Sequence, residues 1–186
     1  VNYGNTAASI TWTHTFSDKL YGKYSVNFSN YNYGVLTDIE GARIQWDASL
    51  NDLMLRSDFS HYINKYLDFS YGLTATFHRF VPGIVQTPDY GRYAIPRNLA
   101  LEHTVYWSNQ QELTDKLILR YGIRWTMFHN IGEATVYSYN ENDVITDSAT
   151  YKSGQIYNSF NAIEPRVGLI YKFSQNSSFK ANYARN

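Results

Sequence analysis

The amino-acid sequence predicts an all-β fold, an antiparallel transmembrane β-barrel segment of about eight strands that belongs to a larger barrel. Apolar and polar residues alternate with period two along most of the 186 residues, which places one stripe of side chains on each face of a strand. Short polar turns alternate with long loops, as in outer-membrane barrels. Aromatic residues reach 17%, with Tyr present 18 times, and such rings suit half-buried strands and membrane interfaces.

The composition excludes several other classes. Lys+Arg and Asp+Glu both number 16, so the chain lacks the basic excess that a nucleic-acid partner would require. The absence of cysteine excludes disulfides and thiolate metal sites. No apolar run approaches the ~20 residues of a membrane-spanning helix, so a membrane location requires strands.

The first half of the chain is predicted to form four strands. They cover roughly residues 6–16, 23–29, 42–62 and 67–78, with a loop near 34–41 and a breaker at 81–83. In the third strand the apolar residues change parity: Ile44, Trp46 and Leu50 are in phase, whereas Leu53 and Leu55 are not. Keeping all of them on a lipid-facing stripe, with Asp47 on the lumen side, requires a β-bulge near Asn51.

The second half is predicted to supply four more strands. A loop of about fifteen residues ends near Arg97, and the fifth and sixth strands cover roughly 99–107 and 117–126. The longest loop follows, at 132–160, and residues 161–186 form the seventh and eighth strands. With the short turns in the periplasm, both chain ends would be extracellular and the chain would stop in mid-strand, which suggests a central barrel segment.

Charged residues alternate with the apolar stripe and are predicted to face the barrel lumen. Arginine or lysine on the lipid face would cost roughly 2–4 kcal/mol at mid-depth, so we place the charges on the inside, where cross-strand ion pairs in the wall are the simplest role. The predicted lumen-facing charges are Arg120, Arg124, Glu164 and Arg166.

Two hairpins resemble those of TonB-dependent outer-membrane transporters. Residues 102–132 resemble a recurrent hairpin in which an acidic residue and Tyr lead through a polar turn to "kL.l..GiR...f...G", and residues 161–186 resemble "fePR.sl.Y.l...ssikasYar". The segment 47–83 is similar to a mid-barrel hairpin of the large glycan- and nutrient-importing receptors. The matching residues of the first hairpin are Glu102, Tyr106, Leu117, Leu119, Gly122, Arg124, Phe128 and Gly132.

The resemblance implies nutrient uptake across the bacterial outer membrane by a barrel of roughly 22 strands. It also implies outer-membrane lipid, a plug domain of the same protein and an inner-membrane energy-coupling protein as partners, and it allows a surface lipoprotein. No plug or energy-coupling segment lies in these residues, and the lumen charges could contact such a plug. No enzymatic activity, cofactor or nucleic-acid partner is implied.

The loops contain the predicted ligand contacts. Exposed aromatic rings stack on sugars and pack against peptides, although Tyr-rich loops also pack on each other. The ligand-contact candidates are Tyr90, Arg92, Tyr93, Tyr137, Tyr139, Tyr151 and Tyr157.

The histidines suggest neither a metal site nor a catalytic site. His14, His61 and His103 fall on the lipid-facing stripe, where amphipathic rings favour the interface, while His78 faces the lumen and His129 lies at the outer end of its strand. No pair has the spacing of metal ligands, and no Ser/His/acid set is credibly placed. A soluble all-β domain, a self-contained eight-stranded barrel acting as an anchor or surface-binding protein, and a membrane-barrel enzyme remain as alternatives.

Overall fold

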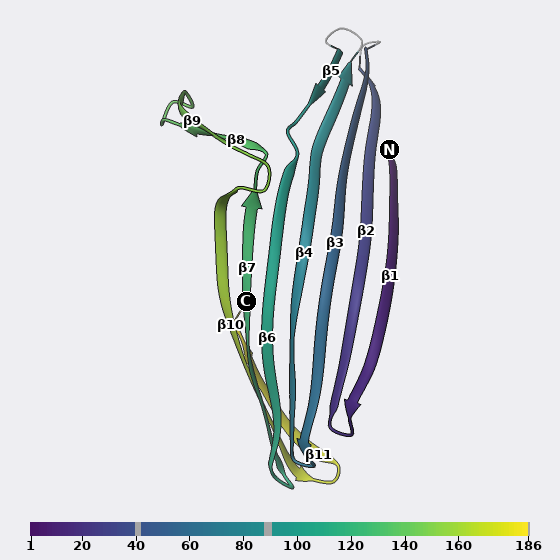
Figure 1. Ribbon diagram of the computed structural model, residues 1–186, viewed down its shortest axis with the longest axis vertical. Coiled ribbons are helices and arrows are strands. Elements are labelled where there is room, and N and C mark those ends of the chain that lie inside the picture. The colour runs from purple at the N-terminus through teal and green to yellow at the C-terminus, as the bar shows by residue number, and fades with distance from the viewer. Residues whose placement is uncertain (40–41, 88–90, 186) are drawn as a thin grey trace.

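The computed structural model describes residues 1–39, 42–87 and 91–185, and only the backbone of residues 39, 42 and 43. It contains one long antiparallel sheet and a separate hairpin (Figure 1). Eight strands lie side by side in sequence order: β1 (Asn2–Ser17), β2 (Leu20–Ile39), β3 (Ala42–Asn64), β4 (Leu67–Thr87), β6 (Asn98–Thr114), β7 (Leu117–Ile131), β10 (Ile156–Ser174) and β11 (Ser177–Ala184). The short β5 (Gly91–Ala94) pairs with β4, and β8 (Ala134–Tyr139) pairs with β9 (Ile145–Tyr151).

The predicted all-β architecture of about eight strands is confirmed. The sheet is open, because β1 and β11 are its two edges within the described residues. No helix in the described part of the chain is long and apolar enough to cross a membrane.

The predicted alternation of short turns and long connections holds for β4–β6 and β7–β10, but not for β2–β3, because β2 ends at Ile39 and β3 begins at Ala42. The turns β1–β2, β3–β4, β6–β7 and β10–β11 gather at one end of the sheet, and the long connections lie at the other (Figure 1). We call these the turn end and the loop end. Each turn begins with a side-chain oxygen that accepts a hydrogen bond from the backbone N–H two residues on, which favours a tight turn. The accepting residues are Ser17, Asn64, Thr114 and Ser174.

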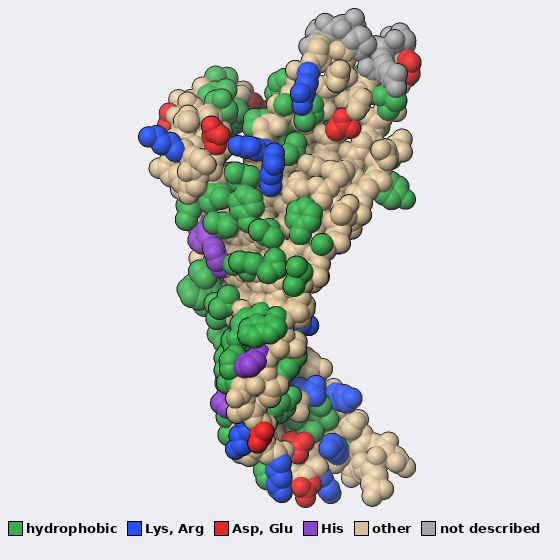
Figure 2. Space-filling model, turned by 45° about the vertical axis from the view of Figure 1, so that its right-hand side comes forward, with side chains coloured by type: hydrophobic (Ala, Val, Ile, Leu, Met, Phe, Trp, Pro, Cys, Tyr) green, Lys and Arg blue, Asp and Glu red, His purple; other side chains and the backbone are tan. Residues whose placement is uncertain are grey.

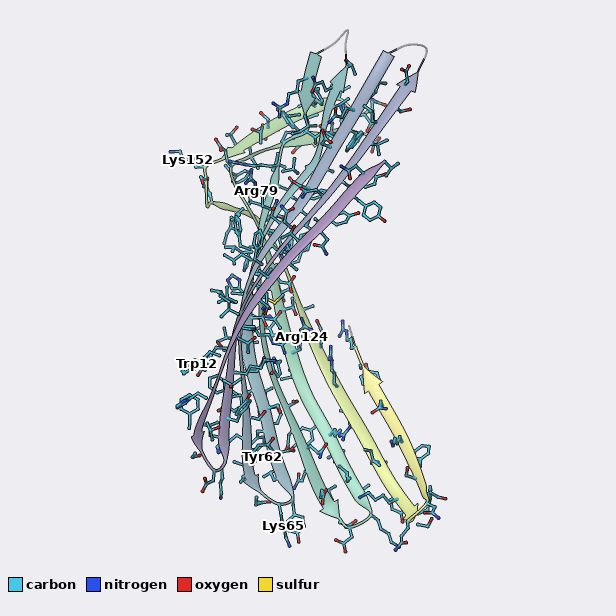
Figure 3. The ribbon with its side chains drawn as sticks, turned by 90° about the vertical axis from the view of Figure 1, so that its right-hand side faces the viewer. Trp12, Tyr62, Lys65, Arg79, Arg124 and Lys152 are labelled. Carbon is cyan, nitrogen blue, oxygen red and sulfur yellow. The ribbon has the colours of Figure 1, made fainter. Side chains whose placement is uncertain are left out.

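The strand register defines the two faces of the sheet. Lys23 lies opposite Asp58, and Arg124 lies opposite Glu164, so charged side chains share one side, the Asp58 face. Val26 lies opposite Leu55, which belongs to the other side, the Leu55 face. Trp12 and Arg124 lie on opposite sides of the sheet in Figure 3. The two faces therefore differ in chemistry as the alternating sequence predicted.

Aromatic rings form a belt across the turn-end half of the Leu55 face. Ring centroids lie 5.2 Å apart for Trp12 and Tyr24, 5.7 Å for Tyr24 and Phe59, and 5.3 Å for Phe59 and Tyr71. The belt resumes on the following strands, where Trp107 lies 5.8 Å from Phe69 and 5.5 Å from Tyr121. Green hydrophobic side chains cover the middle of the molecule in Figure 2, while charged groups lie towards both ends. Such a belt is typical of a membrane interface.

The predicted bulge near Asn51 is wrong. The β2–β3 pairing continues without a shift through Asn30↔Asn51 and on to the loop end. The apolar residues therefore change faces: Leu53 and Leu55 lie on the Leu55 face, whereas Leu50 and Trp46 lie on the Asp58 face. Asp47, predicted in the lumen, lies on the Leu55 face instead.

Strand length explains the exchange. β2, β3 and β4 contain 20, 23 and 21 residues, roughly twice the nine to eleven that cross a bilayer. Their loop-end halves extend beyond the apolar band, so the outer side of the wall meets water there and its side chains are polar. Asparagines form part of this polar surface: the Asn30 amide donates to Asn51 Oδ1, and the Asn32 amide donates to Asn30 Oδ1.

The predicted loops are shorter than expected because strands occupy parts of them. Residues 34–39 of the loop expected at 34–41 belong to β2, which continues to Ile39, and residues 40 and 41 lie outside the described part of the chain. β3 begins at Ala42. β4 continues past Pro82 to Thr87, because the β3–β4 register shift near Asp47 accommodates a residue without an N–H. The loop expected at 132–160 contains β8, β9 and the start of β10.

Candidate functional site

An acidic side chain is held among basic and phenolic partners near the turn end of the Asp58 face. Arg56 Nε lies 2.7 Å from Asp58 Oδ2, and Tyr106 Oη donates to Asp58 Oδ1 at 2.6 Å. Lys23 occupies the position opposite Asp58 on β2. Through Tyr106 the carboxylate therefore links β3 to β6, while its ion pair with Arg56 lies within β3.

Tyr106 reaches Asp58 because Gly72 lies beneath its ring. A Cβ on Gly72 would lie 2.8 Å from Tyr106 Cε1 and 2.4 Å from the Ser57 carbonyl oxygen. Tyr106 and Gly72 are direct partners in the β4–β6 register. Glycine is therefore the residue that permits this close approach.

The four predicted lumen charges occupy the same face. Arg166 Nη2 lies 3.1 Å from Glu164 Oε2, and Thr126 Oγ1 donates to Glu164 Oε1 at 3.4 Å. Arg120 Nε donates to Gln110 Oε1 at 2.6 Å. Arg124 lies opposite both Tyr106 and Glu164, and its Nε is buried without a hydrogen-bond partner among the described residues. The structure thus brings these residues together, and their role in a closed lumen stays a prediction.

A hollow on the Asp58 face contains three of these charges. Its volume is about 660 Å³, and it lies across β4, β6, β7, β10 and β11. Arg56, Arg120, Arg124 and Arg166 line it together with Asp68. This part of the face is therefore rich in cations.

The histidines divide between the two faces. His78 lies on the Asp58 face, with Nδ1 2.8 Å from Asp52 Oδ1 and Nε2 3.7 Å from Glu102 Oε2. His103 and His129 share the Leu55 face with ring centroids 5.8 Å apart, a proximity that their spacing in the sequence did not reveal. Among the described residues, no group of three or more His, Asp or Glu could hold a metal ion.

The predicted ligand residues of the loops do not form one site. Tyr137 and Tyr139 lie on one face of the β8–β9 hairpin, while Tyr151 lies on the other, 5.3 Å from Tyr157. Arg92 and Tyr93 are successive residues of β5, so their side chains point to opposite faces. Tyr90 lies outside the described residues.

A group of aromatic residues lies at the loop end of the Asp58 face, and of its members only Tyr93 was predicted to contact a ligand. Trp46, Tyr31 and Tyr33 lie on this side, and Tyr93 joins them through the register Trp46↔Val85↔Tyr93. The signal was present in the sequence as the parity change at Asn51, which has neither Gly nor Pro beside it. Interpreting that change without a β-bulge would have placed Trp46 on the Asp58 face.

Comparison with known proteins identifies the family. The family described as "TonB dependent receptor-like, beta-barrel" matches residues 1–186, the whole chain. The chain belongs to this family of TonB-dependent receptor barrels. No curated protein matches the sequence.

A solved structure supports the fold of this receptor barrel. The chain is similar to the ferric-catecholate import receptor Fiu from E. coli K12 in its open form, with a TM-score of 0.61 and 14% sequence identity. The match covers 98% of this chain and 35% of that receptor. At this identity the likeness shows the fold alone.

Family membership gives the two faces a physical setting. TonB-dependent receptors reside in the bacterial outer membrane, and the family is one of transporters and receptors, not of enzymes. In such barrels the outer surface carries an apolar band between aromatic girdles and the interior is polar. We therefore expect the aromatic belt of the receptor's Leu55 face to contact lipid.

Proposed function

We propose that the chain forms part of the wall and loops of an outer-membrane transporter that imports a nutrient, with energy supplied from the inner membrane. The observation that carries the proposal is the family match over the whole chain. It agrees with a sheet that has a lipid-compatible face and a charged face. TonB-dependent receptors work with a plug domain and TonB–ExbBD energy coupling, and we propose the same partners here. Outer-membrane lipid and a surface lipoprotein are further proposed partners.

The charged residues have a structural role in this proposal. Arg120, Arg124, Glu164 and Arg166 line the interior of the closed barrel, where Arg120 and Glu164 hold neighbouring strands together through Gln110 and Thr126. Arg124, which lines the hollow of this face together with Arg120 and Arg166, is the proposed contact for a plug domain inside the barrel. Among the tyrosines predicted to contact a ligand, Tyr93, Tyr137 and Tyr139 are exposed enough to meet one entering from outside.

A self-contained eight-stranded barrel that serves as an anchor or surface-binding protein is the second candidate. It would require β1 to pair with β11, and the sheet described here is open. An eight-stranded barrel is also just wide enough for its own side chains, whereas this chain matches 35% of a much longer receptor. Both points support the transporter.

A deletion strain tests the proposal. The gene for the full-length receptor is deleted, and accumulation of single labelled nutrients is compared with that of a strain lacking the energy-coupling protein. We expect at least one nutrient to be lost equally from both strains and restored by the full-length gene. A full-length protein without a plug-sized domain would contradict the proposal. Folding of residues 1–186 alone in detergent, seen as heat-modifiable mobility on a gel, would support the small barrel instead.

A further inference from the structure

His78 lies between two carboxylates that belong to neighbouring strands. From β4, its Nδ1 lies 2.8 Å from Asp52 Oδ1 on β3, and its Nε2 lies 3.7 Å from Glu102 Oε2 on β6. The register explains this arrangement, because Asp52 is the direct partner of His78 and Glu102 is the partner of Thr76, the next residue of the same face towards the turn end. One imidazole ring therefore connects three adjacent strands of the wall.

The imidazole is enclosed by the sheet to which it belongs. Ala100, directly opposite on β6, is 6% exposed, and Thr76 is 4% exposed. The centroid of the Phe128 ring on β7 lies 6.1 Å from that of the imidazole. His78 Nε2 is buried and makes no hydrogen bond among the described residues. Because this atom is already covered in the open sheet, closing the barrel cannot expose it.

The two contacts are satisfied only when each ring nitrogen carries a proton. A neutral imidazole has one N–H and one bare nitrogen. With the proton on Nδ1 the ring donates to Asp52, but the lone pair of Nε2 then faces Glu102. With the proton on Nε2, a lone pair faces the Asp52 carboxylate at 2.8 Å. Either neutral form places two hydrogen-bond acceptors against each other away from water, which is costly.

We propose that His78 is an imidazolium ion that latches β3, β4 and β6 together, and that this latch weakens as the pH rises. On β3, β6 and β7, the nearest other ionisable groups of the Asp58 face are Arg56, Tyr106 and Arg124, each beyond an intervening neutral residue nearer the turn end. Asp52 and Glu102 are therefore the groups that hold the proton. The inference concerns the wall and is independent of what the receptor imports.

The direction of the pH effect follows from proton binding. The folded wall binds the His78 proton more tightly than the unfolded chain does, so folding is favoured while the proton is bound. A histidine in an unfolded chain releases its proton at about pH 6.5. The contribution of the latch to stability is thus complete below that pH and is lost above it, as the proton leaves the folded protein.

The test compares two histidines of the full-length receptor in lipid vesicles. His78→Gln removes the titrating ring but keeps an N–H for Asp52, and Glu102→Gln removes one carboxylate while keeping its shape. His129→Gln is the matched control, because His129 Nδ1 lies 2.8 Å from a neutral partner, Ser159 Oγ. Urea unfolding is followed from about pH 5.5 to about pH 8.5. Nitrogen-15 spectra of receptor labelled at histidine report the protons on each ring, and the signal lost in each variant identifies its ring.

We expect the His78 ring to keep both protons at about pH 7.5. Between the two ends of the pH range, the unfolding equilibrium constant of the native receptor should rise about tenfold more than that of His78→Gln. Glu102→Gln should reduce this pH effect, and His129→Gln should leave it unchanged. A pH profile that neither His78→Gln nor Glu102→Gln alters would overturn the inference. A bare nitrogen on the His78 ring at pH 7.5 would also overturn it, even if a variant failed to fold.

Discussion

The two halves of β2, β3 and β4 have the same backbone and opposite side-chain patterns. Towards the turn end, the Leu55 face is apolar and the Asp58 face holds the Arg56–Asp58–Tyr106 contacts. Towards the loop end, the same Leu55 face carries asparagines, and the Asp58 face carries Trp46 and Tyr33. No register shift in the β2–β3 pairing separates the halves. Alternation of apolar and polar residues with period two thus identifies a strand. Whether the odd-numbered or the even-numbered residues are apolar depends on what surrounds each face.

The position of the exchange indicates where the membrane ends. One row of paired residues on the Leu55 face is apolar: Ala8, Phe28, Leu53 and Phe77. The next row on that face towards the loop end is polar: Thr6, Asn30, Asn51 and Arg79. A boundary that passes between two rows in register on four strands reflects one external plane, not the packing of one strand. We infer that the outer edge of the apolar part of the bilayer lies there.

Introducing an arginine on either side of this boundary should give the largest difference in stability between two variants. Leu73 lies near the middle of the apolar band and is 50% exposed, so Leu73→Arg exposes a cation to lipid. We expect it to destabilise the full-length receptor by about 2–4 kcal/mol, while Asn51→Arg on the same face changes stability by less than about 0.5 kcal/mol. Urea unfolding in lipid vesicles measures both.

The control for this pair is the native Arg79, which already lies on the Leu55 face beside Asn51 and points away from the sheet in Figure 3. Arg79→Leu should therefore have little effect. Equal destabilisation by Leu73→Arg and Asn51→Arg would show that the boundary is misplaced.

The sequence predicted the fold well because strands and turns are encoded locally. The four turns begin at residues whose side chains favour a turn, Ser17, Asn64, Thr114 and Ser174. The alternation of apolar and polar residues indicates the strands between them. The face of Arg124 and Glu164 also followed from alternation, because their neighbours Ile123, Trp125, Ile163 and Pro165 on the two strands are apolar.

The site was less predictable because it depends on how far the strands extend. The parity change at Asn51 could have placed Trp46 on the correct face, but interpreting it required knowing that β2 and β3 continue far beyond the length that crosses a bilayer. The approach of Trp46 to Gly83 depends on the β3–β4 register shift, which connects residues distant in the sequence. The division of Tyr137 and Tyr151 between two faces of a hairpin likewise depends on β8–β9 pairing inside an expected loop.

Removing one tyrosine hydroxyl near the turn end and one near the loop end should give an intermediate difference in stability. Tyr106 donates to Asp58 at 2.6 Å, and a hydrogen bond to a charged group contributes about 1.5–3 kcal/mol. Tyr106→Phe should therefore destabilise the receptor by roughly that amount, as measured by urea unfolding. Tyr33→Phe removes a hydroxyl without a partner among the described residues and should stay within about 0.5 kcal/mol. A similar cost for both changes would mean that the Asp58 contacts do not hold the wall together.

The smallest expected effect is a change in stability whose sign differs between the two sides of the proposed bilayer edge. Ser57 and Asn51 are both polar residues of the Leu55 face on β3, on opposite sides of the proposed edge. Ser57→Leu should stabilise the receptor in vesicles by about 1 kcal/mol, because a polar side chain facing lipid is replaced by an apolar one. Asn51→Leu should be neutral or slightly destabilising, since its side chain faces water and accepts a hydrogen bond from Asn30. Stabilisation by both changes would move the edge of the bilayer beyond Asn51, and Trp46 would then lie at membrane depth instead of above it.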